Sequence, residues 1–162
     1  MSKQLMIRPE KCVSCRTCEM VCSFGHNEEF NPTLSAVSVF NYAENFISVP
    51  VMCMQCDEAC CMEVCPVGAI TRDENGVIKM NSDKCIVCKL CMNACPLGNI
   101  SYSPITKKVF KCDYCDGDPI CVKFCKGGAL NFVVVTENPD RKGNIAEKMK
   151  EVFGEMNTGE EV

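Results

Sequence analysis

The chain lacks the features that would assign it to several common classes of protein. No apolar run in its 162 residues approaches the roughly 18 residues that a membrane-spanning helix needs, so we expect no membrane span. Neither the glycine-rich dinucleotide fingerprint nor a P-loop is present, which leaves flavin, nicotinamide and nucleotide binding unsupported. The formal net charge of −4 at pH 7 provides no basic surface for nucleic acid.

Candidate catalytic residues are scarce as well. His26 is the only histidine, and a surface or capping role explains it more simply than proton transfer. The C-x3-C-x2-C run of radical S-adenosylmethionine enzymes is missing. We therefore expect no catalytic site in this chain.

Cysteine, by contrast, is present in large excess, with seventeen residues in 162. A short chain this rich in cysteine is usually read as a disulfide scaffold. Three observations weigh against disulfides: residues 1–10 contain no apolar export segment, the count is odd, and the cysteines are bunched in close repeats. We therefore expect a reducing, cytoplasmic compartment and thiols that bind metal.

The cysteines form four groups with related spacing. The first and third groups follow C-x2-C-x2-C-x3-C, the signature of bacterial ferredoxins, in which the fourth cysteine binds the other cluster and is often followed by proline. Pro96 supplies that proline in the third group, and Ser23 replaces it in the first. The four groups are Cys12, Cys15, Cys18, Cys22; Cys53, Cys56, Cys61, Cys65; Cys85, Cys88, Cys91, Cys95; and Cys112, Cys115, Cys121, Cys125.

One cysteine of the second group is in excess. The other groups all leave three residues before their last cysteine, and the same gap in CMQCDEACCMEVC selects Cys61. We therefore predict that Cys60 is not a ligand.

The spacing favours 4Fe–4S clusters over zinc. A cubane needs one thiolate for each of four irons, so a tight loop can supply three and a distant cysteine the fourth. Structural zinc sites usually pair two C-x2-4-C hooks across a spacer and do not need three thiols packed as closely as Cys12 to Cys18. A zinc-stabilised interaction module stays the alternative.

The order of the groups predicts a nested arrangement. Residues 53–103 have the form of an intact two-cluster ferredoxin module, and the groups at 12–22 and 112–125 enclose it. Exchange of the fourth ligand within each pair then gives four sites, numbered 1 to 4. The predicted ligands are Cys12, Cys15, Cys18 and Cys125 at site 1; Cys112, Cys115, Cys121 and Cys22 at site 2; Cys53, Cys56, Cys61 and Cys95 at site 3; and Cys85, Cys88, Cys91 and Cys65 at site 4.

Short strands are expected between the cysteine groups. Asn75-Gly76 is a strong two-residue turn signal between apolar residues and predicts a hairpin. Alternating apolar residues predict a pair of strands around NYAEN. These residues are Val37 and Val39, then Ile47, Val49 and Val51. The stretches ISYSPITKKVF and LNFVVV are also interpreted as short strands. We therefore predict an α+β fold of duplicated bacterial-ferredoxin-like modules.

Glycine follows each closing cysteine at the third position. Its recurrence predicts a positive φ, or a close chain approach, that ends a short helical turn. The four glycines are Gly25, Gly68, Gly98 and Gly128.

The domain boundary is placed by a change of composition. We expect residues 1–136 to form the four-cluster domain and residues 137–162 to form a loop, a short amphipathic helix and an acidic tail. The apolar face of this helix, Ile145, Met149, Val152 and Phe153, favours packing on another subunit.

The cysteine pattern as a whole resembles the four-cluster electron-transfer subunits of the dimethyl sulfoxide reductase and formate hydrogenlyase type. The groups CRTCEMVC and CDYCDGDPICVKFC make it most similar to the subunits that accompany carbon monoxide dehydrogenase and tungsten enzymes of the aldehyde:ferredoxin oxidoreductase family, such as class II benzoyl-CoA reductase. The resemblance covers residues 4–135, and Lys126 stands where the family usually has proline.

This resemblance implies a function. The chain would hold four 4Fe–4S clusters and relay electrons to or from the catalytic subunit of an anaerobic, cytoplasmic oxidoreductase, of tungsten-pterin or carbon monoxide dehydrogenase type, and exchange them with a further carrier or subunit. Thiolate-bound clusters add to the acidic charge, so basic docking surfaces are expected on partners. A freely diffusing polyferredoxin is the alternative.

Several lysines adjoin the cysteine groups. The simpler interpretation is that they are solvated surface residues. The alternative is that they provide a local positive charge that favours the reduced clusters. These residues are Lys84, Lys89, Lys111, Lys123 and Lys126.

Overall fold

The computed structural model describes residues 2–135. The helix and acidic tail predicted within 137–162 lie outside the described residues. The strands are β1 (Ser2–Ile7), β2 (Val37–Tyr42), β3 (Ile47–Met52), β4 (Ile70–Arg72), β5 (Ile78–Met80), β6 (Ile100–Ser103), β7 (Lys108–Lys111) and β8 (Leu130–Val135). The α-helices are α1 (Thr17–Asn27), α2 (Cys60–Glu63), α3 (Leu90–Ala94) and α4 (Ile120–Lys123), with 3-10 helices η1 (Pro9–Lys11), η2 (Pro32–Leu34), η3 (Ala43–Asn45) and η4 (Tyr114–Gly117).

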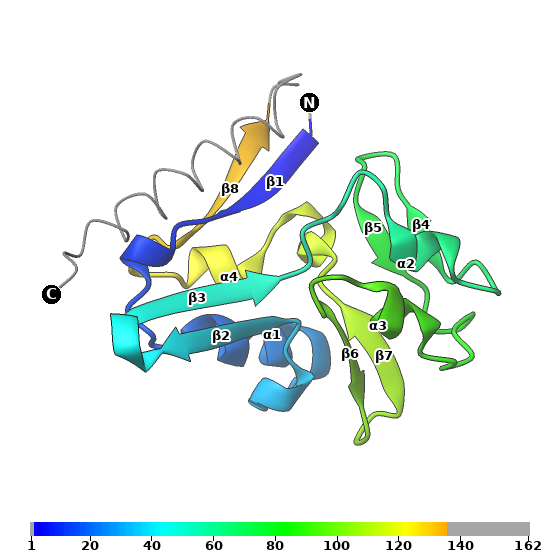
Figure 1. Ribbon diagram of the computed structural model, residues 1–162, viewed down its shortest axis with the longest axis horizontal. Coiled ribbons are helices and arrows are strands. Elements are labelled where there is room, and N and C mark those ends of the chain that lie inside the picture. The colour runs from blue at the N-terminus through cyan, green and yellow to red at the C-terminus, as the bar shows by residue number, and fades with distance from the viewer. Residues whose placement is uncertain (1, 136–162) are drawn as a thin grey trace, which may run out of the picture.

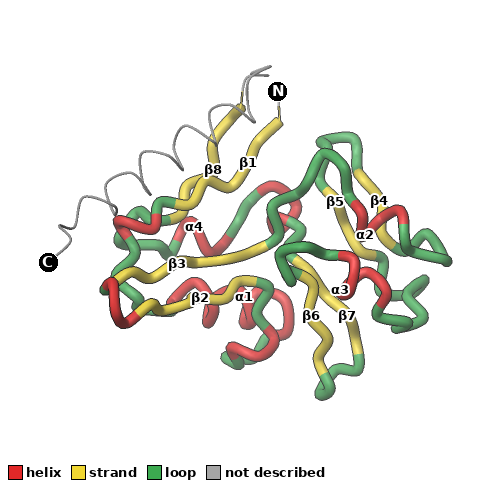
Figure 2. Tube along the Cα trace, viewed as in Figure 1, coloured by secondary structure: helices red, strands yellow, loops and turns green. Residues whose placement is uncertain are grey.

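The strands form four antiparallel pairs, β1–β8, β2–β3, β4–β5 and β6–β7. Figure 1 shows β1, β8, β2, β3, α1 and α4 on one side of the molecule, and we call this part the outer half. The other side holds α2, α3 and the strands β4 to β7, which we call the inner half, and Figure 2 shows the same division along the chain trace. The fold is a small α+β fold, as predicted.

The hairpin predicted at Asn75-Gly76 is confirmed. The Asp73 Oδ1 atom accepts hydrogen bonds from the N–H groups of Asn75 at 2.9 Å and Val77 at 2.8 Å. Gly76 has a φ of 80°, which a residue with a side chain rarely adopts. These contacts close the turn between β4 and β5.

The strands predicted around NYAEN are also confirmed, but the predicted alternation of β3 is wrong. Val37 lies opposite Met52, and Val39 lies opposite Pro50, and these four residues are buried. Residues directly opposite each other in an antiparallel pair share one face of the sheet. Met52 and Pro50 therefore face the core, and Ile47, which is 39% exposed, does not.

Proline decides the length of two helices. Pro66 and Pro96 follow the closing cysteines of the second and third groups. Helix α2 ends two residues before its closing cysteine, and α3 ends one residue before its own. Proline has no N–H to donate and clashes with the preceding helical turn. Ser23 permits the first helix to continue, and α1 reaches Asn27.

The glycine prediction holds for three of the four groups. The φ angles are 58° at Gly68, 63° at Gly98 and 70° at Gly128, and each N–H donates to the carbonyl oxygen of the closing cysteine. Gly25 is the exception, because α1 continues through it. A Cβ atom at Gly25 would lie 3.6 Å from the Ile120 side chain, which is ordinary contact.

Two apolar cores follow the two halves, except that Cys53 and Val77 from the stretch 53–103 belong to the outer core. In the outer half α1 packs against α4, and in the inner half α2 packs against α3. Cysteines belong to both cores, so the sulfur atoms occupy positions that aliphatic side chains fill in other small domains. The outer core contains Leu5, Cys18, Val21, Val37, Val39, Met52, Cys53, Val77, Cys112, Tyr114, Cys121 and Leu130, and the inner core Ala59, Ile70, Ile78, Cys91, Ile100 and Val109.

Close backbone contact joins the first and fourth cysteine groups. A Cβ atom at Gly127 would lie 2.6 Å from the carbonyl oxygen of Lys11, a distance too short for any side chain. The loop before Cys12 and the loop after Cys125 therefore touch through their main chains. None of the helices within residues 2–135 is long and apolar enough to cross a membrane.

Candidate metal centres

The seventeen cysteines are all free thiols in the structure. Three cavities are lined by cysteines of two groups, and each holds a set of three from one group and one from another group, with Cys60 as a fifth cysteine in one of them. The cysteines that meet in this way are Cys12, Cys15, Cys18 and Cys125; Cys53, Cys56, Cys61 and Cys95; and Cys65, Cys85, Cys88 and Cys91. These are the sets predicted for sites 1, 3 and 4. The ligation itself stays a prediction.

The cysteines predicted for site 2 also lie near one another. Burial raises the pKa of Cys112 to about 12, and the charge of Cys22 adds to the effect. Burial also raises the pKa of Cys121, and charges on Cys112, Cys22 and Cys115 raise it further. Cys112 and Cys121 belong to the outer core, and α1, which carries Cys22, packs against α4, which carries Cys121.

The donor set suits a metal or cluster that takes thiolates. At Cys18 burial raises the pKa to about 12, so the unligated thiol is neutral at pH 7. A bound metal ion or cluster takes cysteine as the thiolate and displaces the proton. Soft thiolate ligands favour iron–sulfur clusters and zinc among the common choices.

The same backbone strain recurs in all four cysteine loops. In each group the second residue after the first cysteine has a positive φ: Ser14 (56°), Gln55 (50°), Val87 (58°) and Tyr114 (60°). Left-handed conformations cost free energy in residues that carry a Cβ, and β-branched valine is especially unfavourable there. Turns of this kind point successive N–H groups into one concavity, which is a common feature of anion and iron–sulfur sites.

Backbone N–H groups also reach two of the sulfur atoms. The Ala69 N–H donates to Cys65 Sγ at 3.2 Å, and the Asn99 N–H donates to Cys95 Sγ at 3.4 Å. Burial raises the pKa of Cys65, but hydrogen bonds from four nearby backbone N–H groups outweigh it and lower the pKa below its ordinary value. Such hydrogen bonds stabilise the thiolate that a metal needs.

Cys60 lines the same cavity as the four cysteines predicted for site 3. Its side chain is exposed, whereas the neighbouring Cys61 is partly buried. Both cysteines are at the start of α2. The prediction that Cys61 and not Cys60 is the ligand stays a prediction.

The structure brings His26 to a predicted ligand, which sequence reasoning missed. The His26 Nε2 atom lies 3.5 Å from Cys115 Sγ and 3.8 Å from Asp113 Oδ1. The three donor atoms lie within 4.8 Å of one another. His26 is 89 residues from Cys115, and the one signal for this approach was the absence of proline at position 23, which lengthens α1.

Glu19 is a buried carboxylate beside site 1. It is 4% exposed, its Oε1 atom accepts the Val39 N–H at 2.7 Å, and its Oε2 atom lies 3.6 Å from Arg16 Nη1. Its negative charge is one of the causes, after burial, that raise the pKa of Cys18. Its position directly after Cys18 gave no indication of burial.

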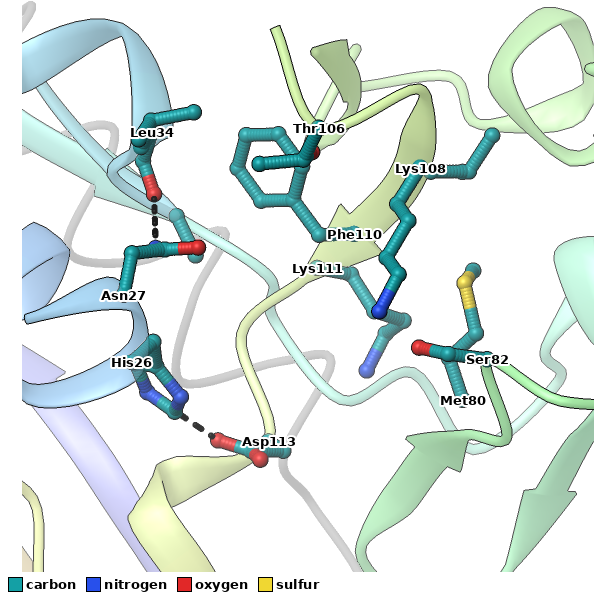
Figure 3. Close-up of a pocket in the computed structure, with 12 residues that line it drawn as sticks. His26, Asn27, Leu34, Met80, Ser82, Thr106, Lys108, Phe110, Lys111 and Asp113 are labelled. Atoms are coloured by element: carbon teal, nitrogen blue, oxygen red, sulfur yellow. Dashed lines mark hydrogen bonds and ion pairs between the residues drawn. The ribbon is translucent and has the colours of Figure 1, made fainter.

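A cavity of about 230 Å³ lies between the two halves (Figure 3). His26 and Asp113 line one part of it, and Lys108 and Lys111 extend from β7 into another part. Lys111 is buried, with only 7% of its surface exposed, so the solvated role does not apply to it.

The strained cysteine loops and their shared cavities define the class as iron–sulfur proteins. Residues 44–135 match the model of the 4Fe–4S dicluster domain family, which is more than half of the chain. The chain therefore belongs to the 4Fe–4S dicluster domain family. The matched residues contain the second, third and fourth cysteine groups, and the first group precedes them.

Curated relatives match part of the chain. It is 39% identical over 85 residues to the polyferredoxin-like subunit of an aliphatic sulfonate oxidoreductase of Pyrococcus furiosus, a match that covers 52% of this chain and 49% of the relative. Identity to the electron transport protein HydN of Escherichia coli K12 is 34% over 99 residues, covering 55% and 53%. Formate hydrogenlyase subunit 2 of the same organism is 37% identical over 79 residues, covering 49% and 37%. The chain thus spans about half or less of the length of these relatives.

Solved structures of the active site complex BamBC of benzoyl coenzyme A reductase are similar over most of the chain. With 1,5-dienoyl-CoA bound, the TM-score is 0.50 at 28% identity, covering 94% of this chain and 91% of that chain. With benzoyl-CoA bound, the TM-score is 0.51 at 24% identity, covering 95% of both chains, which shows the fold alone. The resemblance inferred from the cysteine spacing is therefore confirmed.

Proposed function

We propose that the protein is an electron-transfer subunit that holds four 4Fe–4S clusters for a larger oxidoreductase. The observation that carries the proposal is the meeting of three cysteines from one loop with a fourth from another loop around a single cavity. A cubane needs this number of thiolates from this kind of arrangement. When bound, each cluster takes up one electron and gives it back.

The chain's own residues have three roles in this proposal. The sixteen cysteines of sites 1 to 4 supply the thiolates, and Cys60 is left without a ligand role. The turns at Gly68 and Gly98 direct the N–H groups of the next residues toward the sulfur atoms of Cys65 and Cys95, and such hydrogen bonds raise the reduction potential. The two apolar cores exclude water from the buried cysteines.

Contacts between the sites support a row in the order 1, 2, 3, 4. Cys18 of site 1, Cys112 and Cys121 of site 2 and Cys53 of site 3 belong to one core cluster. Sites 3 and 4 share the inner core, where α2 packs on α3. Electrons would then pass along a line from one end of the protein to the other.

The same contacts favour the nested arrangement. Pairing of β1 with β8 and packing of α1 on α4 bring the first and fourth groups together around residues 53–103. An inner two-cluster module would then be enclosed by an outer pair.

We further propose that the partner is a catalytic redox subunit in the cytoplasm, with a second carrier at the other end of the row. The names of the relatives describe subunits and electron transport proteins, and the similarity to the BamBC complex at 28% identity favours an enzyme of the benzoyl-CoA reductase kind. The tungsten cofactor of that enzyme is proposed from the resemblance of the cysteine groups alone. No catalytic residue is needed in this chain for such a role.

Iron and sulfide analysis of the anaerobically purified protein tests the cluster proposal. Four cubanes require about sixteen irons with as many acid-labile sulfides in each chain. We expect these values and an EPR signal that appears on reduction with dithionite. Zinc without sulfide would replace the proposal with a zinc-stabilised module, and about eight irons would restrict it to two clusters.

Size-exclusion chromatography of an anaerobic native extract tests the subunit role. We expect the chain to elute with a larger redox enzyme. Elution alone, at the 17.9 kDa of the single chain, would instead indicate a freely diffusing polyferredoxin.

A further inference from the structure

A buried lysine lies at the junction of the two halves. Lys111 is the last residue of β7 and is 7% exposed, whereas Lys108 on the same strand is exposed. Within residues 2–135, the hydrogen-bond acceptors of the Lys111 ammonium are main-chain carbonyl oxygens, that of Cys112 at 2.7 Å and that of Ile78. Burial of an ammonium costs free energy unless negative charge compensates it, and carbonyl groups are neutral.

Gln55 binds the same two residues as Lys111 but carries no charge. Its Nε2 atom donates to the Cys112 carbonyl at 2.8 Å, and its Oε1 atom accepts the Ile78 N–H at 2.8 Å. Gln55 is 4% exposed and lies in the loop of site 3, and Cys112 is the first cysteine of site 2. Lys111 and Gln55 together therefore fasten the loop of site 3 to the start of site 2.

The charge of Lys111 acts on cysteines of both sites. At Cys61 of site 3, burial raises the pKa and Lys111 acts in the opposite direction. At Cys112 of site 2, burial again raises the pKa and Lys111 again opposes it. The geometry agrees, because the ammonium binds the main-chain carbonyl of Cys112, the first predicted ligand of site 2, and Gln55 of the site 3 loop binds the same oxygen atom.

On the basis of the proposed function, we propose that the buried Lys111 ammonium compensates the negative charge of sites 2 and 3 and so raises their reduction potentials above those of sites 1 and 4. Reduction of one site adds one electron and one negative charge and transfers no proton. A positive charge in a poorly solvated interior stabilises that added charge more than a solvated one does. Lys111 would thus make the junction of the halves the part of the row where an electron is most stable.

Redox titration of Lys111→Met tests this proposal. The full chain is purified anaerobically, its iron and sulfide are measured, and its EPR signals are followed as dithionite is added as the electron donor. We expect two of the four midpoint potentials to fall by 59 mV or more, which is a tenfold change in a one-electron equilibrium constant. Lys111→Gln, which keeps a donor for the two carbonyl groups, should show the same fall.

Two control variants separate charge from structure. Lys108→Met removes the same charge from an exposed position on the same strand and should leave all four potentials unchanged. Gln55→Met breaks hydrogen bonds to the same two residues without a change of charge. It should lower the thermal unfolding temperature, and because Gln55 lies in the strained loop of site 3 it serves as a control for stability and iron content and not for the potentials.

Each outcome decides the proposal. Unchanged potentials in both Lys111 variants at full iron content would overturn it, as would an equal fall in Lys108→Met. Iron loss from both Lys111 variants but not from Gln55→Met would support the proposal, because it would show that the clusters need the positive charge. Iron loss from all three variants would overturn it, because Lys111 would then act only as a structural contact. An unmodified protein without 4Fe–4S clusters would overturn the proposed function instead.

Discussion

The two halves of the molecule carry related cysteine loops but differ in the residue after the closing cysteine. In the inner half this residue is an exposed proline, Pro66 or Pro96, and α2 and α3 have four and five residues. In the outer half Ser23 comes after Cys22, and α1 has eleven residues. In the first group, the absence of this proline therefore permits a longer helix that brings further side chains to its neighbours.

The fourth group shows that proline is not the one way to end such a helix. Lys126 takes the place of proline, yet α4 ends at Lys123. Gly127 must then lie against the main chain of Lys11, and Gly128 has a φ of 70°. In this group the short helix is accompanied by close main-chain contact with the first group.

The halves also differ in buried charge. The outer half buries Glu19 beside Cys18, where its negative charge opposes reduction. The junction with the inner half buries Lys111, where a positive charge favours reduction. For the proposed row of four clusters, the difference predicts unequal reduction potentials.

The largest effect is expected from Ser23→Pro, which would give the outer half the proline of the inner half. Ser23 is inside α1, fully buried, and its Oγ atom donates to the Met20 carbonyl at 2.9 Å and accepts the Asn31 N–H at 3.1 Å. Proline within a helix costs about 3 kcal/mol or more. We expect a matching loss of stability in circular dichroism melting curves, with loss of iron from sites 1 and 2.

Two control variants test whether the proline itself is responsible. Ser23→Ala keeps the helix and removes the hydroxyl bonds, so it should cost about 1 kcal/mol. Pro96→Ser, at an exposed position after α3, should change stability by less than about 1 kcal/mol. An equal loss in Ser23→Pro and Ser23→Ala would contradict the role given to the proline.

A smaller effect, limited to one site, is expected from Cys61→Ser in the inner half. This change removes one predicted ligand of site 3, so about four of about sixteen irons should be lost, or the cluster converted to a form with fewer irons. Cys60→Ser is the matched control, one residue away on the same cavity, and should keep all the iron. Equal iron loss from both variants would show that the assignment of Cys61 is mistaken.

Local signals predicted much of the inner half. Asn75-Gly76 places a turn by itself, because few residues adopt the positive φ of Gly76, and the cysteine gaps are fixed by the chemistry of the loop.

In the outer half, the sequence predicts the β2–β3 pair but not which alternate residues of β3 face the core. Apolar residues occur at nearly every position from Ile47 to Met52, so the sequence does not say which alternate set is buried.

Contacts between distant segments could not be predicted. β1 was not expected, because SKQLMI has weak alternation and its partner β8 begins at Leu130. Burial of Lys111 depends on β5 and the site 3 loop folding against it, and the residue type by itself indicates a solvated surface position. The approach of His26 to Cys115 depends in the same way on the packing of the outer half.

The smallest effect is expected from His26→Ala, which removes a side chain that the longer helix of the outer half supplies. His26 Nε2 lies 3.5 Å from Cys115 Sγ, and a hydrogen bond donated to a ligand sulfur raises the reduction potential. We expect one midpoint potential to fall by less than about 59 mV, the value of a tenfold change, with iron content unchanged. His26→Gln, which keeps a donor near the position of Nε2, should restore part of that fall. A shift of the same size in both variants would show that the hydrogen bond is not its cause, and that α1 affects site 2 through packing alone.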